Sequence, residues 1–352
     1  MLSTRLHRVI ANLVSKITVA LCFAVPLTLI AQDRATGALP LPEKKFKEID
    51  KAEAIPGAAV GEPKTSMRSR FPPCRDQGTQ FSCTGFAVAY AVKSYLEAVQ
   101  QGWNTFDDEH VFSPAFIYNQ FSNDHGTTGI YIQQALAFLQ GGGCCAWKDM
   151  PYDPNDASSR PTKDLLDQAR KFRIAWWDAL PVKNIQTMKS YLVVHVPLII
   201  GANVDIEEKG KWQQNTKGVT DEYLHPDHLG YHSMVVTGYD DDKNAFEVMN
   251  SWGPDWNDSG YGWVDYKFWP KFVREGYVTD NVRTAPLAPA TGLKPDQVKW
   301  LPVGPEGAVN GNWGFPWAVD LKKLRFGKGK TLPAEVKQYL PASFSTHVTG
   351  DH

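Results

Sequence analysis

The residues best suited to chemistry are a cysteine, a histidine and an asparagine that lie far apart in the chain: Cys83, His232 and Asn250. A thiol becomes a nucleophile when a base takes its proton, and a third group must hold the ring of that base. His232 and Asn250 flank turn-forming residues at 240–244, so an antiparallel pair of strands would bring them side by side. Together the three residues indicate catalysis by a thiol, with His232 as the base and Asn250 as the residue that orients it.

Cys83 stands where a long, buried helix should begin. The chain from Phe86 to Leu96 is apolar almost all round, which predicts a buried helix that Gly102 ends. We expect Ser82 to be the N-cap, so that Cys83 lies in the first turn, where free N–H groups and the helix dipole favour a thiolate. The alternative for this cysteine considered alone is a small, buried core residue.

Helices are expected in the first half of the chain and strands in the second. After the helix from Cys83, the pattern predicts helices at 113–118, with Ser113 as N-cap, and at 131–139, and a short one at 183–194. Buried or alternating apolar runs then predict strands at 197–202, 231–239, 245–250 and 261–266. This order predicts an α+β fold with two lobes.

The chain has 352 residues, 43% of them hydrophobic, and a formal net charge of −1. This length suits one large domain or two modest ones, and the charge gives no indication of a nucleic-acid partner. Arg5, Arg8 and Lys16 precede an apolar run at 17–31, so we expect residues 1–31 to be an export signal. The protein should then be periplasmic or secreted, and membrane-anchored by residues 17–31 only if they are not cleaved.

Residues 32–70 have short apolar runs and are interpreted as a linker or short pro-segment that packs weakly, if at all. We expect the globular domain at 71–285 and a C-terminal extension at 286–352. Four cysteines remain after residue 31, and with Cys83 free we expect one disulfide from Cys74 to Cys144 or Cys145. We expect no metal and no cofactor.

Several separated motifs resemble those of papain/cathepsin-type cysteine peptidases, over roughly residues 71–285. They are Asp76-Gln77-Gly78, Ser82-Cys83-Thr84-Gly85-Phe86, Ser113-Pro114, His232, Asn250-Ser251-Trp252-Gly253-Pro254-Asp255-Trp256 and Gly260-Tyr261-Gly262. The resemblance implies a helical N-terminal lobe, an antiparallel, β-barrel-like C-terminal lobe and an active-site cleft between them.

The resemblance also implies roles for individual residues. Cys83 would be the nucleophile, His232 the general acid/base and Asn250 its orienting residue, while the Gln77 side chain and the Cys83 N–H would form the oxyanion hole. Trp252 would cover the Asn250–His232 hydrogen bond. The residues that would contact substrate are Gly129 and Tyr231 along its backbone, Ser233 near a specificity pocket and Trp256 on the leaving-group side.

One departure from the family concerns the loop before the nucleophile. Gln80 stands where the family has a cysteine three residues before the nucleophile, and Gly126 stands where that cysteine has its partner. Both halves of this bridge are absent together, as expected of a bacterial-type variant without the disulfide next to the nucleophile.

The function expected from these residues is that of a monomeric cysteine-type endopeptidase, which hydrolyses peptide or protein substrates through a covalent acyl-enzyme. Two alternatives stay open. One is a catalytically inactive papain-like binding protein, and the other is a cysteine amidase or transpeptidase that acts on cell-wall peptides.

Overall fold

The computed structural model describes residues 35–281, except 50, 56, 57, 59, 124, 206–213, 216 and 221–228, together with the strands at 300–301 and 315–316. The expected export segment at 1–31 and most of the C-terminal extension at 286–352 lie outside the described residues. Within the described part of the chain, no helix is both long enough and apolar enough to cross a bilayer.

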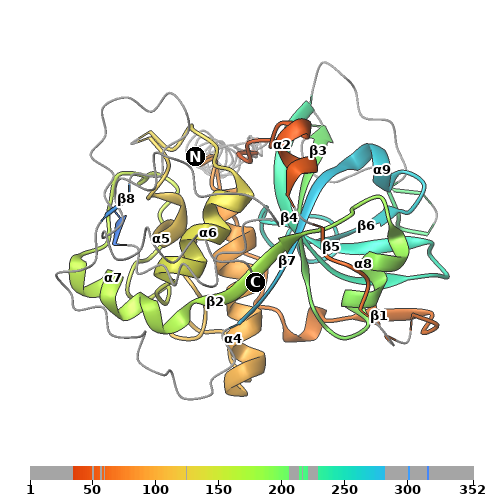
Figure 1. Ribbon diagram of the computed structural model, residues 1–352, viewed down its shortest axis with the longest axis horizontal. Coiled ribbons are helices and arrows are strands. Elements are labelled where there is room, and N and C mark those ends of the chain that lie inside the picture. Colours follow the sequence, from red (N-terminus) through yellow and green to blue (C-terminus); the bar gives the residue numbers. More distant parts are fainter. Residues whose placement is uncertain are drawn as a thin grey trace, which may run out of the picture. The chain divides into compact units, whose positions relative to one another are not determined.

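A long, buried helix runs from Cys83 to Gln101 (Figure 1), which confirms the predicted element. Its successive stretches are α3 (Cys83–Gly85), the π-helical η2 (Phe86–Lys93) and α4 (Ser94–Gln101). Gly102 ends it with φ 71°, in the left-handed region that glycine tolerates best. The other helical elements are α2 (Glu43–Glu48), η1 (Arg68–Arg70), α5 (Pro114–Tyr118), α6 (Ile132–Gly142), α7 (Lys163–Ala169), η3 (Arg170–Phe172), α8 (Ile185–Leu192) and α9 (Trp269–Phe272).

The two serines expected to cap helices behave differently. Ser113 caps α5 as predicted, because its Oγ accepts the N–H of Phe116 at 3.2 Å and Pro114 occupies the first helical position. Ser82 stands at the N-cap position of α3, but its hydroxyl bonds the Tyr152 hydroxyl at 2.7 Å instead of a helix N–H. The predicted N-cap position of Ser82 is confirmed, but its side chain makes no capping hydrogen bond.

The strands form a seven-stranded antiparallel sheet in the order β2-β7-β3-β4-β5-β6, with β1 also paired to β4. Its path through the described strands is open, with β2 and β6 at the two ends, and the α+β class is confirmed. The strands are β1 (Lys64–Ser66), β2 (Ile174–Ala179), β3 (Leu198–Asp205), β4 (Leu229–Asp240), β5 (Ala245–Met249), β6 (Tyr261–Asp265) and β7 (Val273–Asn281). A separate pair joins β8 (Trp300–Leu301) to β9 (Phe315–Pro316).

Three strands of the sheet were not predicted from the sequence. The central strand β7 lies between β2 and β3, but Arg274 and Glu275 interrupt its apolar pattern. The edge strand β2 begins with an irregular register, and β1 is only three residues long. Backbone hydrogen bonds hold β7 on both sides, and they hold β1 and β2 on one side each. A pattern of hydrophobic residues does not reveal this pairing.

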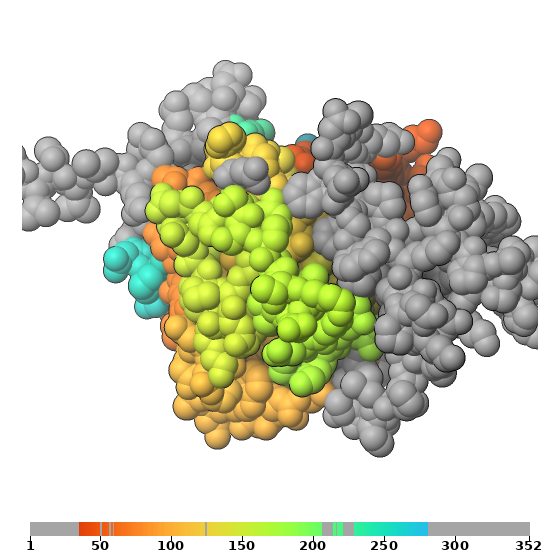
Figure 2. All heavy atoms as spheres, turned by 90° about the vertical axis from the view of Figure 1, so that its left-hand side faces the viewer, coloured from red at the N-terminus to blue at the C-terminus, as the bar shows by residue number. Residues whose placement is uncertain are grey.

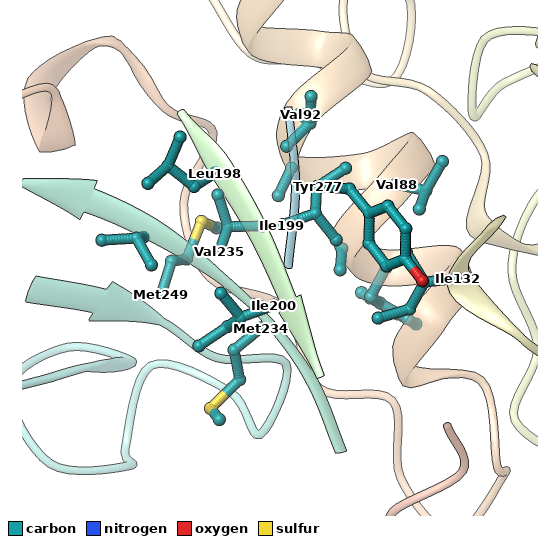
Figure 3. Close-up of a cluster of buried hydrophobic side chains, with 14 of the residues drawn as sticks. Val88, Val92, Ile132, Leu198, Ile199, Ile200, Met234, Val235, Met249 and Tyr277 are labelled. Carbon is teal, nitrogen blue, oxygen red and sulfur yellow. The ribbon is translucent and has the colours of Figure 1, made fainter. Parts of the chain in front are cut away.

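The core joins the long helix to the sheet across β3 (Figure 3). Because strand side chains alternate, β3 is buried on both faces. One group of side chains packs between β3 and the helices: Val88, Val92, Ile132 and Tyr277. A second group packs on the opposite face of β3: Leu198, Ile200 and Met234. The helical side of the molecule, which includes α7 and β2, is shown in Figure 2.

The four cysteines of the described chain are free thiols, so the predicted disulfide from Cys74 is wrong. Cys74 packs against Gly260, where an added Cβ would overlap its side chain. The thiol of Cys144 instead donates to the carbonyl of Ser113 at 3.5 Å, at the start of α5. Cys74 and Cys144 thus pack against different parts of the chain.

Candidate active site

The thiol of Cys83, at the start of the long helix, faces strand β4. The backbone N–H of Ser233 donates to Cys83 Sγ at 3.4 Å. The hydroxyl oxygens of Thr84 and Ser233 lie 2.9 Å apart, and both hydroxyls lower the pKa of the Cys83 thiol. Polar groups of the helix and of β4 therefore surround the sulfur where the helix meets β4.

The imidazole of His232 is fixed in one orientation and one tautomer. Its Nε2 lies 2.7 Å from Asn250 Oδ1, which also accepts the backbone N–H of Ser251 at 2.7 Å. Because that N–H can only donate, the atom it meets must be the amide oxygen, and His232 Nε2 must then carry the proton. His232 Nδ1, which has no hydrogen-bond partner among the described residues, keeps a lone pair that can take a proton.

Two tryptophans pack behind this histidine. The Trp252 ring lies 4.7 Å from the His232 ring, between centroids, with an interplanar angle of 32°. Trp256 meets Trp252 edge-on at 5.6 Å and is fully buried. The structure thus places Trp252 directly on the histidine, and Trp256 behind Trp252 rather than on an exposed surface.

The Gln77 side chain is held from two directions. Ser251 Oγ donates to Gln77 Oε1 at 2.6 Å, and Gln77 Nε2 donates to the carbonyl of Gln80 at 2.8 Å. The Tyr152 hydroxyl donates to the Gln77 backbone carbonyl at 2.7 Å. Tyr152 was not singled out from the sequence, because a single tyrosine outside the motifs carries no signal of its own. Ser251, in contrast, could be found from the sequence because it lies next to Asn250 in one of the motifs.

Gln80 and Gly126 lie against each other, next to the nucleophile. An added Cβ at Gly126 would lie 2.9 Å from Gln80 Cγ, and the Phe81 N–H donates to the Gly126 carbonyl at 2.9 Å. The long Gln80 side chain therefore fills the space that Gly126 leaves open. This packing and the backbone bond tie the Gln77–Cys83 loop to the helical part.

A segment from the N-terminal part of the chain, residues 35–41, lies over these groups. We call it the covering segment. The N–H groups of Gly37 and Ala38 donate to the Tyr231 carbonyl at 3.2 and 3.1 Å. The Ile130 N–H donates to the Gly37 carbonyl, and the Leu39 N–H to the Ile130 carbonyl, both at 3.0 Å.

Ala35, the first residue of the covering segment, contacts the loops that contain Gly78 and Trp252. The indole N–H of Trp252 donates to the Ala35 carbonyl at 3.0 Å, and the Ala35 N–H donates to the Gly78 carbonyl at 3.4 Å. The expectation that 32–70 packs weakly is wrong for these residues. Backbone groups and small side chains make the contacts, and a pattern of apolar residues does not reveal them.

The fit of the covering segment depends on glycine. A Cβ on Gly37 would overlap the Phe81 carbonyl, and a Cβ on Gly129 would overlap the Gly37 carbonyl. Of the residues expected to contact substrate, Gly129 and Tyr231 thus contact the covering segment, and Ser233 contacts Cys83. Cys83, His232 and Gln77 are fully buried.

Burial keeps both reacting groups neutral in this state. It raises the pKa of the Cys83 thiol to about 11, although the N–H of Ser233 and the two hydroxyls lower it in part. Burial also lowers the pKa of His232 to about 4, against a smaller, opposite effect of the Asn250 hydrogen bond. At neutral pH the covered site therefore holds a thiol and an imidazole rather than an ion pair.

The lowered pKa of His232 predicts a loss of stability in acid. A folded-state pKa of about 4 against 6.5 means that the unfolded chain binds the proton more readily, so stability is complete above pH 6.5 and falls as pH drops toward 4. The difference is about 3 kcal/mol in the free energy of unfolding. Denaturant titrations of the wild type and of His232→Gln between pH 4 and 7 measure it.

The contribution of His232 to the pH dependence of stability is the difference in the free energy of unfolding between the wild type and His232→Gln. Glu275 acts with the opposite sign, because its raised pKa makes the folded state the better proton acceptor, and it is common to both proteins. The stability difference between wild type and His232→Gln should therefore shrink in acid. A difference that stays constant from pH 7 to 4 contradicts the assignment.

Residues 63–268 match the family model described as papain family cysteine protease. An uncharacterized peptidase C1-like protein of Acanthamoeba polyphaga mimivirus is 25% identical over 203 residues, which cover 55% of this chain and 64% of that protein. Cysteine proteinase 1 of Zea mays is 26% identical over 207 residues, which cover 54% and 52%. The chain thus spans between about half and two-thirds of the length of these curated relatives.

Among solved structures, xylellain, a cysteine protease from Xylella fastidiosa, has a similar fold. The TM-score is 0.60 at 21% identity, with 72% of this chain and 98% of that chain covered. The family model covers more than half of this chain and includes Gln77, Cys83, His232 and Asn250. The chain belongs to the papain family of cysteine proteases.

Proposed function

We propose that this protein is an exported cysteine-type endopeptidase that hydrolyses peptide bonds through a covalent acyl-enzyme. The observation that carries the proposal is the His232–Asn250 hydrogen bond, which leaves Nδ1 unprotonated next to the strand position that holds the Cys83 thiol. Family membership and the position of Cys83 at a helix N-terminus support the same chemistry.

In the proposed reaction, His232 Nδ1 takes the proton of Cys83 as the sulfur attacks the peptide carbonyl. The developing oxyanion would be held by Gln77 Nε2 and by the N–H of Cys83, which begins the helix and so lacks an acceptor within it. The imidazolium then protonates the leaving amine. Water, deprotonated by His232, releases the acyl group and restores the thiol.

The proposed enzyme is latent while the covering segment is in place. Gly37, Ala38 and Leu39 use the backbone groups of Ile130 and Tyr231, against which we expect an extended substrate to bind. Release of the segment would let water reach the thiol and the imidazole, which removes the desolvation that keeps them neutral.

The test is the site of modification by a thiol-directed epoxysuccinyl probe on the full chain. We expect Cys83 to be the residue labelled. Cys74 and Cys144 serve as internal controls, since burial raises the pKa of each thiol to about 12 and neither has a histidine partner among the described residues. Peptide mapping by mass spectrometry identifies the modified residue.

Two outcomes would contradict the proposal. Labelling spread equally over the cysteines would mean that Cys83 has no special reactivity. Labelling of Cys83 without hydrolysis of any peptide, even with the covering segment loosened, would favour the inactive binding protein. Hydrolysis of cell-wall peptides but not of unfolded protein would favour the amidase.

A further inference from the structure

The hydroxyl of Tyr152 lies between two residues of the loop before the nucleophile. It donates to the Gln77 carbonyl at 2.7 Å and lies 2.7 Å from Ser82 Oγ. Burial raises the pKa of this hydroxyl, so it keeps its proton at neutral pH. Because a carbonyl can only accept, the tyrosine proton goes to Gln77, and the Ser82 hydroxyl must donate to the Tyr152 oxygen. One phenol thus joins the two ends of the loop.

The two joined residues carry the donors of the proposed oxyanion hole. Gln77 supplies its side-chain Nε2. Ser82 supplies the carbonyl half of the planar peptide unit whose N–H belongs to Cys83, so the position of Ser82 fixes the direction of that N–H. An oxyanion hole lowers the barrier only when its donors are in place before the charge develops. The spacing between Gln77 and Ser82 therefore matters to the reaction, and the Tyr152 hydroxyl spans it.

Tyr152 is itself held in place by other aromatic rings. Its ring meets Phe86 edge-on, with 4.8 Å between the centroids and an interplanar angle of 83°, and its centroid lies 6.0 Å from that of Trp147. The next residue contacts the same loop, because the side-chain amide of Gln80 donates to the Asp153 carbonyl at 3.3 Å. A packed ring and its chain neighbour thus fix the phenol against the loop.

The loop has no covalent tether in this chain. Gln80 and Gly126 stand at the two positions where the resemblance places a disulfide, and they meet only by packing. We infer that Tyr152 is a positioning residue for the oxyanion hole, whose hydroxyl sets the spacing of the Gln77 and Cys83 donors where the disulfide is missing. This inference rests on the proposed endopeptidase function.

The hydroxyl can be removed while the ring stays. In Tyr152→Phe the ring keeps its contacts with Phe86 and Trp147, so we expect the variant to fold. The Gln77 carbonyl loses this donor, and the Ser82 hydroxyl loses its acceptor, so both ends of the loop are released. Small displacements of groups that must be positioned in advance slow an enzyme strongly.

The experiment compares a reaction that needs the oxyanion hole with one that does not. We would use the full chain with Gly37→Ala, which loosens the covering segment, with and without Tyr152→Phe. Peptide hydrolysis passes through an oxyanion, whereas iodoacetamide alkylates the Cys83 sulfur by displacement of iodide. Tyr152→Phe should lower kcat by about ten- to a hundredfold and leave KM within about twofold, since the oxyanion forms only after attack. The alkylation rate of Cys83 should also stay within about twofold.

Tyr95→Phe is the matched control. It removes another buried tyrosine hydroxyl that donates to a backbone carbonyl, that of His195 at 2.8 Å. Tyr95 lies on α4, and its hydroxyl contacts neither Gln77 nor Ser82. Both kcat and the alkylation rate should therefore stay within about twofold of the parent.

Ser82→Ala is a second variant, which removes the other end of the bridge. It should lower kcat in the same direction as Tyr152→Phe and leave the alkylation rate unchanged. The double variant should lose no more than Tyr152→Phe alone, because the two hydroxyls act as one unit. If Tyr152→Phe does not fold, a selective loss of kcat in Ser82→Ala supports the inference and an unchanged kcat overturns it.

Failure of the inference and failure of the proposed function give different results. An unchanged kcat in a folded Tyr152→Phe variant overturns the role of Tyr152. So does an equal loss of kcat and of alkylation rate, which would mean that the tyrosine supports the site as a whole. Either result leaves the endopeptidase intact. If the Gly37→Ala parent hydrolyses no peptide, the proposed function fails and the inference fails with it.

Discussion

Replacing Gly37 with alanine is expected to raise the rate at which a thiol-directed probe labels Cys83 by about ten- to a hundredfold. The new Cβ overlaps the Phe81 carbonyl, a backbone group that cannot rotate away. Overpacking of this kind costs about 1–3 kcal/mol, and here the cost falls on the covered state alone. The uncovered state gains population by the corresponding factor, and the labelling rate measured over time reports it.

Gly61→Ala is the matched control for this prediction. It makes the same chemical change at a glycine that has nothing within 4 Å of an added Cβ, so the labelling rate should stay within about twofold of the wild type. Equal rates for the wild type and a folded Gly37→Ala variant would show that the covering segment does not limit access.

A second variant separates release of the segment from distortion of the loop before Cys83. Leu39→Pro removes the N–H that donates to the Ile130 carbonyl at 3.0 Å, and it leaves the contact with Phe81 unchanged. It should raise the labelling rate in the same direction as Gly37→Ala. If Leu39→Pro has no effect, the effect of Gly37→Ala must come from the Phe81 loop.

The local parts of the site could be predicted from the sequence because short-range chemistry determines them. The apolar run after Cys83 and Gly102 define the ends of the long helix. The turn at 240–244 sets the register of β4 and β5, which brings Asn250 to His232. Each of these features depends on a few neighbouring residues, so it can be read without knowledge of the rest of the fold.

The covering segment could not be predicted, because its contacts are made by the backbone. Gly37, Ala38 and Leu39 pair with residues that are 91 or more positions away, and small side chains allow the approach. The same three residues read as an ordinary linker in the sequence. Neither composition nor periodicity distinguishes a segment that pairs with a distant edge from one that pairs with nothing.

Glu275 was missed for a related reason. A charged residue within a run of mixed polarity indicates an exposed strand or a loop, yet β7 is a central strand and Glu275 is buried. The two tyrosines that donate to its carboxylate come from β4 and from β7 itself. A buried carboxylate of this kind becomes recognisable only when the strands that supply its donors are placed side by side.

We expect the covering segment, rather than the site's own residues, to keep Cys83 and His232 neutral. The Ser233 N–H and the Asn250 amide oxygen favour the charged forms, but burial outweighs them. The same residues would therefore support a thiolate–imidazolium pair once water enters. In this view the segment controls the charge of the pair as well as access to it.

Replacing Cys83 with alanine in the Gly37→Ala background is expected to lower kcat/KM for peptide hydrolysis by at least about a thousandfold. Without the sulfur no acyl-enzyme can form, and what remains is the small contribution of the oxyanion donors and of substrate binding. The matched control is Cys145→Ala, which removes another buried, free thiol, one whose pKa is also raised by burial. It should keep kcat/KM within about threefold, since a small cavity affects stability rather than the reaction. Undiminished hydrolysis by a folded Cys83→Ala variant would show that another group carries the reaction, and His232 and Asn250 would then need a different role.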